Sequence, residues 1–287
     1  MKELLEVKRL LSSSSCSLFL EGKKVQPEFF LLKKEEKKSL CAIDGGSSPL
    51  LITPSVCIVY VRVASVHYLP KNISLENYLV TIIPFEKDNN LYVRATAIHS
   101  SGQEELFAEP IKTFGDNPSL ESIGGLARKL LEWRYVKKAQ SKVDIVLWDG
   151  SLTTITKVEK NHKPIGCIAV AKSTSAMGSW QGFSKQGLWA ARVNQETYFA
   201  RLHEKSKHIL RIDTNNKELL DSLVAWSCDP VFLGYPYPLV VADELARVSF
   251  AQTSSLRAQL QSVLGEDWKN LSFGEQDAHS ILDSMKF

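Results

Sequence analysis

The sequence predicts a mixed α/β fold in which helices pack against a sheet, and three features of the chain indicate it. Its 287 residues, 44% of them apolar and 23% charged, suit one large soluble domain with short appendages. Segments rich in Val, Ile and Tyr come first, and one long helical pattern follows them. The remainder mixes both patterns, which is the order expected of a mixed sheet flanked by helices.

The first expected strands are consecutive and have short connections. They cover residues 39–44, 56–66, 78–84 and 91–98, and a turn-like Asp-Asn-Asn segment separates the last two. Such a series predicts an antiparallel meander. Residues 1–38 differ in texture, with a serine tract and a run of alternating charges. We therefore expect an N-terminal extension at 1–38, as a candidate dimer or partner contact, and the main domain at 39–287.

A helix, two buried strands and a mixed C-terminal part are expected next. Asn117 and Pro118 predict a helix start, with Asn as N-cap, and the apolar stripe continues to about residue 138. Continuous apolar runs at 143–148 and 165–171 predict strands buried on both faces. The remaining expected elements are a hairpin at 197–203 and 208–212, a helix at 216–226, and a helix from about residue 240 to 264.

Charge and cysteine content exclude several classes of function. The net charge is only +3, so any nucleic-acid binding must come from local clustering of basic residues. The five cysteines form no CxxC pair, which argues against a zinc site or a disulfide framework and agrees with a reducing cytoplasm. No apolar run is long enough to span a membrane, and the serine tract interrupts any signal-like start, so we expect a cytoplasmic protein. The chain also has no P-loop for nucleotide-triphosphate hydrolysis.

Two of the expected strands end in an Asp-Gly pair, and these aspartates are the first candidate metal ligands. The apolar residues 41–43 precede Asp44, and the apolar residues 145–148 precede Asp149. Carboxylates at strand ends lie at the mouth of a sheet, where ligands commonly bind, and the glycine lets the chain turn. Each aspartate could also simply begin a turn. The repetition of the pattern, with a helix before the second pair, supports a shared site about as well as it supports two separate turns.

The expected helix offers a further carboxylate. Glu121 and Glu132 are about three helical turns apart and share nearly one face, so either could point toward the two aspartates. The alternative is a solvent-facing pair with Arg128. Clustered carboxylates repel one another unless a cation lies between them, and hard oxygen ligands favour Mg²⁺ or Mn²⁺. Two such ions can activate a water and stabilise the leaving oxygen of a phosphodiester.

Three segments resemble the signature blocks of the NurA nucleases, and they occur in the same order. They are residues 42–47 (AIDGGS), 145–152 (IVLWDGSL) and 234–243 (GYPYPLVVAD). The last block is the most specific, and the resemblance extends from about residue 38 to 250. It implies an RNase H-like core and Mn²⁺-dependent cleavage of DNA, as a 5′ to 3′ exonuclease and a single-strand endonuclease. It also implies a homodimer that docks on the hexameric HerA translocase in DNA end resection, the repair of double-strand breaks and homologous recombination.

The resemblance also implies roles for individual residues. Asp44 and Asp149 correspond to the two strand-end metal ligands. Glu132 corresponds to the helix glutamate, with Glu121 as the fallback. Asp243 falls where the family has His or Asp, and it would complete a site for Mn²⁺, with Mg²⁺ as the alternative ion. The expected DNA or phosphate contacts are Lys172, Arg201 and Tyr235. For the tyrosine, packing in a Pro-rich turn is the alternative.

Other functions remain open at this point. A non-catalytic DNA-binding adaptor of a motor ATPase would keep the fold, although a decayed enzyme would be expected to lose Asp44 or Asp149. An RNA-guided or hybrid-cutting nuclease would need guide-binding lobes, for which the chain is short. A thiol hydrolase using Cys41 or Cys167 lacks a motif that places a base beside either thiol. Because the chain is shorter than many NurA proteins, we expect a DNA-binding insertion to be reduced.

Overall fold

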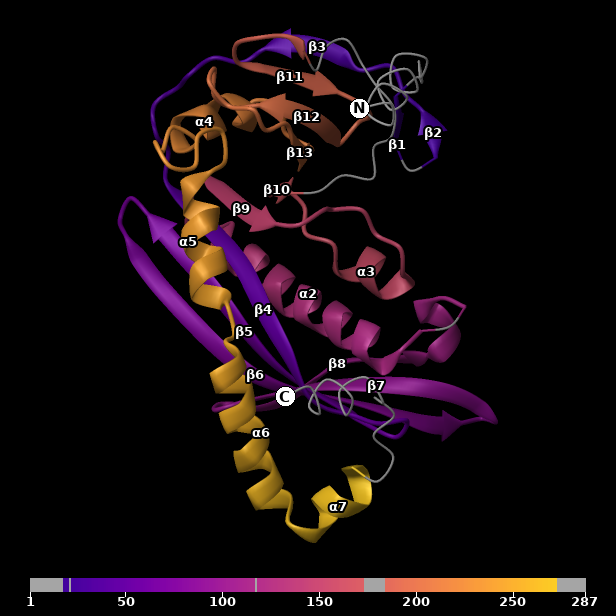
Figure 1. The fold of residues 1–287 in the computed structure, drawn as a ribbon. Helices are drawn as coiled ribbons and strands as arrows, with labels where there is room; N and C mark the ends of the chain where they lie inside the picture. The colour runs from indigo at the N-terminus through magenta and orange to yellow at the C-terminus, as the bar shows by residue number, and fades with distance from the viewer. Residues whose placement is uncertain (1–17, 21, 117, 173–183, 273–287) are drawn as a thin grey trace, which may run out of the picture. The chain divides into compact units, whose positions relative to one another are not determined.

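The computed structural model describes residues 18–20, 22–116, 118–172 and 184–272, and their contacts divide the chain into two units (Figure 1). Unit 1 takes its described residues from 18–38, 149–152 and 166–237, and unit 2 from 39–148, 153–165 and 238–272. Both units combine strands and helices, as the sequence predicts. None of the helices in these ranges has the length and apolar character needed to cross a membrane.

Unit 2 is built on the predicted antiparallel meander, which leads into a parallel strand. Its strands are β4 (Leu40–Ile52), β5 (Cys57–Tyr68), β6 (Asn72–Lys87), β7 (Asn90–His99), β8 (Gly102–Pro110) and β9 (Ile145–Asp149). They stand in the order β9-β4-β5-β6-β7-β8. The pairs from β4 to β8 are antiparallel, and β9 lies parallel to β4. A meander, a helix and then a parallel strand beside the first strand make the RNase H-like arrangement that the resemblance implies.

Different helices cover the two faces of the unit 2 sheet (Figure 1). The helical elements are η1 (Ile111–Phe114), α2 (Leu120–Ala139), α3 (Lys157–His162), α5 (Tyr237–Ala246), α6 (Phe250–Leu264) and α7 (Glu266–Ser272). On one face α2 packs against β4, β5 and β6. On the other face, Leu256 and Leu260 of α6 pack on a core cluster that includes Leu50 and Tyr60. Alternate residues of β4 and β5 therefore face different helices.

Helix boundaries differ from the prediction in two places. Ser119 caps α2, because its side chain accepts a 3.0 Å hydrogen bond from the Ser122 amide, and Asn117 lies outside the described residues. The single helix predicted from about residue 240 to 264 is wrong, since α5 ends at Ala246 and α6 begins at Phe250. Ser249 starts α6 with a capping box to Gln252, which supplies the N-terminal donors of a new helix with partners.

Strand predictions were more accurate where the strand is apolar. The turn between β6 and β7 is confirmed, and both Asp88 and Asn89 adopt positive φ there (51° and 56°) as a tight hairpin turn requires. Strand β8 was missed because its first half is polar and rich in glutamate. The strand predicted at 39–44 is too short, since β4 continues to Ile52.

The described part of unit 1 is an antiparallel sheet with one helix. Its strands are β3 (Glu28–Leu31), β10 (Ile168–Ala171), β11 (Trp189–Arg192), β12 (Thr197–Arg201) and β13 (Leu210–Asp213), in the order β3-β11-β12-β13-β10, beside the helix α4 (Leu219–Trp226) and a small pair, β1 (Phe19–Leu20) and β2 (Lys23–Lys24). The predicted hairpin is confirmed as β12 and β13. The described part of the predicted extension contributes β3, which pairs with β11. The domain boundary after residue 38 stays a prediction.

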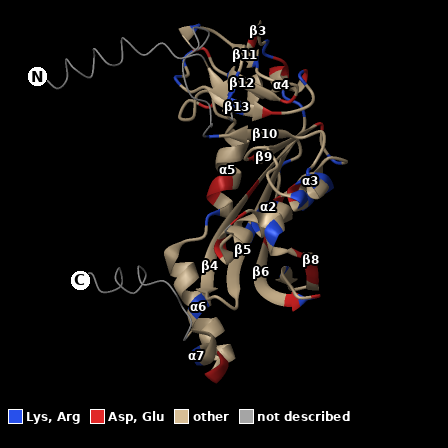
Figure 2. Cartoon of the chain, turned by 90° about the vertical axis from the view of Figure 1, so that its right-hand side faces the viewer, with Lys and Arg blue, Asp and Glu red and all other residues tan. Residues whose placement is uncertain are grey.

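Charged residues vary from one element to the next. Figure 2 shows blue, basic segments on α2 and α3, and red, acidic segments on α5 and β8. Their sequences agree, because α2 carries Arg128, Lys129 and Arg134 whereas α5 carries Asp243 and Glu244. The small net charge of the chain therefore conceals local regions of opposite sign.

Candidate metal centre

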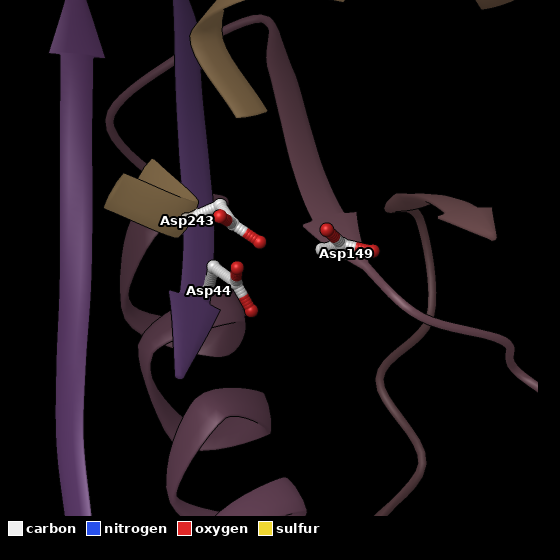
Figure 3. A group of neighbouring side chains, drawn as sticks. All are labelled: Asp44, Asp149 and Asp243. Carbon is white, nitrogen blue, oxygen red and sulfur yellow. The ribbon is translucent and has the colours of Figure 1, made fainter. Parts of the chain in front are cut away.

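Three of the four predicted metal ligands meet in the structure. Asp44, Asp149 and Asp243 each offer a carboxylate oxygen, and these oxygens all lie within 4.8 Å of one another (Figure 3). They come from β4, β9 and α5, which are far apart in the sequence. Asp44 is only 9% exposed, and the side chains of Asp149 and Asp243 are 12% and 33% exposed. The group is therefore partly shielded from water yet remains accessible to a solute.

Asp44 is held in the middle of a strand, which corrects the expectation that its strand ends there. Gly45 and Gly46 continue β4 and allow close packing on both sides instead of making a turn. A Cβ at Gly45 would overlap the Glu132 carboxylate of α2, and a Cβ at Gly46 would overlap the Ala246 carbonyl of α5. Since side chains alternate along a strand, Asp44 lies on the same face as Gly46, toward α5.

Asp149 ends β9, as predicted, and the register of the strands places it beside Asp44. Trp148 pairs with Ile43 in the parallel β4–β9 ladder, and the next residue of each strand is the aspartate. The boundary between the two units falls after Trp148, within β9. Asp149 follows directly and is the last residue of that strand. Two apolar strands of matched register therefore bring these two carboxylates together.

Asp243 lies in the second half of α5 and is already neutralised in part. Its Oδ2 atom is 3.0 Å from the Arg247 guanidinium, which also lies 3.3 Å from Glu244. The Arg247 backbone carbonyl accepts a hydrogen bond from Arg62 of β5. The chain just after α5, where the sequence analysis missed a helix end, is therefore attached to the sheet face that carries Asp44.

Two predicted phosphate contacts meet at Asp149, and the third does not. The Lys172 Nζ atom lies 2.7 Å from Asp149 Oδ2, and the Tyr235 hydroxyl donates to the same oxygen at 3.3 Å. Arg201 instead donates to the backbone carbonyls of Lys185 and Glu204, at 2.9 and 2.8 Å. Its guanidinium therefore fastens neighbouring chain segments within unit 1.

Glu132 lies beside the strand but outside the aspartate group. It is 2% exposed, and its Oε2 atom accepts a 2.7 Å hydrogen bond from the Trp148 indole. Arg128 reaches its Oε1 atom at 3.4 Å and donates to the Gly45 carbonyl at 2.7 Å. Glu121, the fallback residue, is exposed near the other end of α2. Of the two glutamates, Glu132 is therefore the one beside the Asp44 segment.

Asp213 is a buried carboxylate that the sequence analysis missed. It is 2% exposed and accepts hydrogen bonds from the Ser151 hydroxyl (2.7 Å), the Leu152 amide (2.9 Å) and Arg211 Nε (3.0 Å). It thereby fixes the segment that directly follows Asp149. The available signal was a carboxylate at the end of the apolar strand after residue 210, where the predicted hairpin stopped one residue short.

A histidine does lie beside one of the cysteine thiols, contrary to the expectation. The His67 Nε2 atom is 3.4 Å from Cys41 Sγ. However, burial raises the pKa of the Cys41 thiol to about 12, and burial with the nearby Lys142 charge lowers the pKa of His67. At neutral pH the thiol therefore stays protonated beside a neutral imidazole, which is the opposite of an activated nucleophile.

Comparison with known proteins finds a family domain in part of the chain and a similar fold in solved structures. Residues 195–248 match the NurA domain, a range that includes Tyr235 and Asp243, and no curated protein matches the sequence. The crystal structure of the NurA nuclease from Sulfolobus solfataricus is similar, with 14% identity, a TM-score of 0.51, and 84% of this chain and 88% of that chain covered. A crystal structure of NurA and one of NurA with manganese each have 9% identity and a TM-score of 0.51. They cover 82% of this chain, and 90% and 91% of theirs. At these identities the likeness to the solved structures is one of fold.

Proposed function

We propose that the protein is a deoxyribonuclease that hydrolyses phosphodiester bonds with the help of divalent metal bound at Asp44, Asp149 and Asp243. The observation that carries this proposal is the approach of the three carboxylates to within 4.8 Å. The match of residues 195–248 to the NurA domain supports the choice of substrate, and a solved structure of similar fold is described as NurA with manganese.

The donor set fits a small divalent cation. Two oxygen ligands of one Mg²⁺-sized ion, each about 2.1 Å from it, stand at most about 4.2 Å apart. The observed spacing therefore needs only a small contraction. Three carboxylates this close repel one another, and Lys172 on Asp149 and Arg247 on Asp243 show how strongly the group attracts positive charge. We propose Mn²⁺ as the ion and Mg²⁺ as the alternative.

The residues around the group have separate tasks in this proposal. A bound ion supplies Lewis-acid stabilisation and a more acidic water. Lys172 can exchange its bond to Asp149 for a non-bridging phosphate oxygen, while the Tyr235 hydroxyl orients the Asp149 carboxylate. Glu132 positions β9 beside β4 through Trp148, and it remains the predicted fourth carboxylate. Asp213 keeps the chain after Asp149 in place.

The finer features of the function rest on family resemblance. We propose a homodimer that resects DNA ends in the cytoplasm with a HerA-type hexameric ATPase, as a 5′ to 3′ exonuclease and single-strand endonuclease. The adaptor alternative shares the DNA and motor partners but predicts no cleavage.

End-labelled single-stranded and duplex DNA incubated with Mn²⁺, Mg²⁺, Ca²⁺ or EDTA tests the proposal. We expect degradation with Mn²⁺ and none with EDTA. Asp44→Asn should lower the rate by at least about 100-fold, because even residues that only support a metal ligand commonly matter 10- to 100-fold. The control is Asp88→Asn, an exposed turn carboxylate. DNA binding without cleavage under every ion would favour the adaptor and overturn the nuclease.

A further inference from the structure

A second polar site lies in unit 2, on the α2 side of the sheet. A cavity of about 250 Å³ opens there between β5, β6 and the end of α2. It is lined by Ser65, His67, Asn72, Ser74, Tyr135, Lys138, Ala139 and Lys142. The lining includes no carboxylate, and most of its side chains carry hydrogen-bond donors. The chemistry of the cavity is thus opposite to that of the aspartate group.

The positive charge of the cavity comes from two lysines. Lys138 lies in the last turn of α2, and Lys142 follows about one turn later. Among the described residues neither forms an ion pair. The Lys142 charge acts on another lining residue, because it helps to lower the pKa of His67. A positive charge near a helix C-terminus is stabilised by the helix dipole, and this explains the position of Lys138. It does not explain why Lys142 lies close to a histidine.

The floor of the cavity consists of donors placed by strand register. Ser65 pairs with Ser74, and His67 pairs with Asn72, so both pairs point to the face that α2 covers. Ser65 is 5% exposed, and it is one of the residues that line the cavity. A serine hydroxyl that lines a cavity can donate a hydrogen bond to a solute there.

The neighbouring cavity differs because carboxylates line it. It measures about 370 Å³ and shares Tyr135 and Lys138 with the first. There His99 contacts Glu76 at 2.8 Å and Arg134 pairs with Glu104, so two carboxylates lie among its basic side chains. The smaller cavity, by contrast, is lined by two lysines and no carboxylate.

We propose that the smaller cavity binds a phosphate group. Lys138 and Lys142 would supply the charge, and Ser65 and Ser74 would donate hydrogen bonds to phosphate oxygens. The site is separate from the aspartate group, because Ser65 and Asp44 lie on opposite faces of the β4–β5 pair. The adjoining cavity leaves room for the rest of a phosphate-bearing molecule. This proposal does not depend on the nuclease proposal.

Calorimetric titration of the full chain in EDTA tests the site, since EDTA removes metal from the aspartate group. The probes are inorganic phosphate, a deoxynucleoside monophosphate and a short single-stranded oligonucleotide. The Lys138→Gln/Lys142→Gln double variant should weaken binding by at least about tenfold, and Ser65→Ala by a smaller factor. Lys137→Gln, an exposed lysine of the same turn, is the matched control and should bind like the wild type.

The probe that responds identifies the source of the phosphate. Loss confined to the oligonucleotide indicates a DNA backbone phosphate, and loss confined to the mononucleotide indicates a terminal phosphate. Phosphate binding should also raise the pKa of His67 in a proton NMR titration, because a nearby anion offsets the effect of Lys142. The proposal is overturned if no probe binds at millimolar concentration, or if the double variant binds every probe as tightly as the wild type.

Discussion

The two faces of the β4–β5 strand pair hold opposite charge within a few residues of each other. Toward α5, Asp44 and Asp243 approach each other with Asp149. Toward α2, Ser65 lines a cavity beside two lysines. Residues 44 and 65 are neighbours in the ladder, since Ser65 pairs with the residue before Asp44. Alternation along a strand thus lets one pair of strands present a cation site on one face and an anion site on the other.

The helices, more than the strands, determine this difference. The strand residues are polar on both faces, but α5 brings an acid to one of them and α2 brings bases to the other. A change in either helix should therefore affect its own face first. The predictions below test how independent the two faces are.

Glu132→Ala is expected to have the largest effect on stability. It leaves the buried Trp148 indole without its acceptor and removes the ion-pair partner of Arg128, which should cost about 3 kcal/mol in the free energy of unfolding. Urea unfolding with tryptophan fluorescence measures it. Glu132→Gln keeps an acceptor for the indole and should cost less. If Glu132→Gln abolishes cleavage while the stability is retained, Glu132 acts as a metal ligand and the two faces are coupled.

Gly46→Ala should affect the α5 face and Gly45→Ala the α2 face. Each added methyl group overlaps a neighbouring helix, and we expect each variant to lose about 1–3 kcal/mol of stability. Gly46→Ala should also weaken Mn²⁺ binding, because it moves the helix that carries Asp243. A manganese titration followed by thermal unfolding distinguishes the effects of the two substitutions on metal binding. Equal loss of metal binding in both variants would show that the faces do not act independently.

Asp243→Asn should stabilise the metal-free protein slightly and remove the stabilisation by metal. It relieves repulsion among three carboxylates, an effect of about 0.5 kcal/mol for partly exposed groups. The melting temperature in EDTA should rise, and its increase with Mn²⁺ should fall. A variant whose melting temperature still rises with Mn²⁺ as in the wild type would remove Asp243 from the site.

The smallest expected effect is a pH dependence that involves α2 and α3. Burial raises the pKa of Glu159, but hydrogen bonds from Lys129 and the amides of Thr156 and Ile155 outweigh it and hold the pKa below its ordinary value of 4.5. A lowered pKa stabilises the folded state above 4.5, and this stabilisation is lost as the pH falls through the folded pKa. Acid unfolding of Glu159→Gln should therefore show a shallower loss of stability below pH 4.5. An unchanged acid profile would contradict this.

The sequence predicted the meander and the long helix well, because their apolar periodicity is strong. It missed β8, whose residues are largely charged, and it merged α5 with α6, because no Gly or Pro marks the break at Arg247. Local patterns describe single elements, and these errors fall where the pattern is weak or where a cap decides the boundary.

The site was only partly predictable for a different reason. Asp44 and Asp149 could be found because each follows an apolar run, and Asp243 came from family resemblance. The pairing of Ser65 with Ser74 depends on strand register, and Asp213 acts through contacts with residues 151 and 152. Neither can be recognised until the strands are placed side by side.

The adjacent glycines of β4 also have a consequence for how this protein tolerates mutation. Because Gly45 touches one helix and Gly46 the other, no rotamer or small shift frees both positions at once. Gly125, by contrast, has open space where a side chain would go. In a library of random variants selected for folded protein, survivors should be abundant at Gly125 and nearly absent at the glycine pair. Because two helices pack closely on these positions, the fold should tolerate fewer substitutions at the glycine pair than at the aspartate before it.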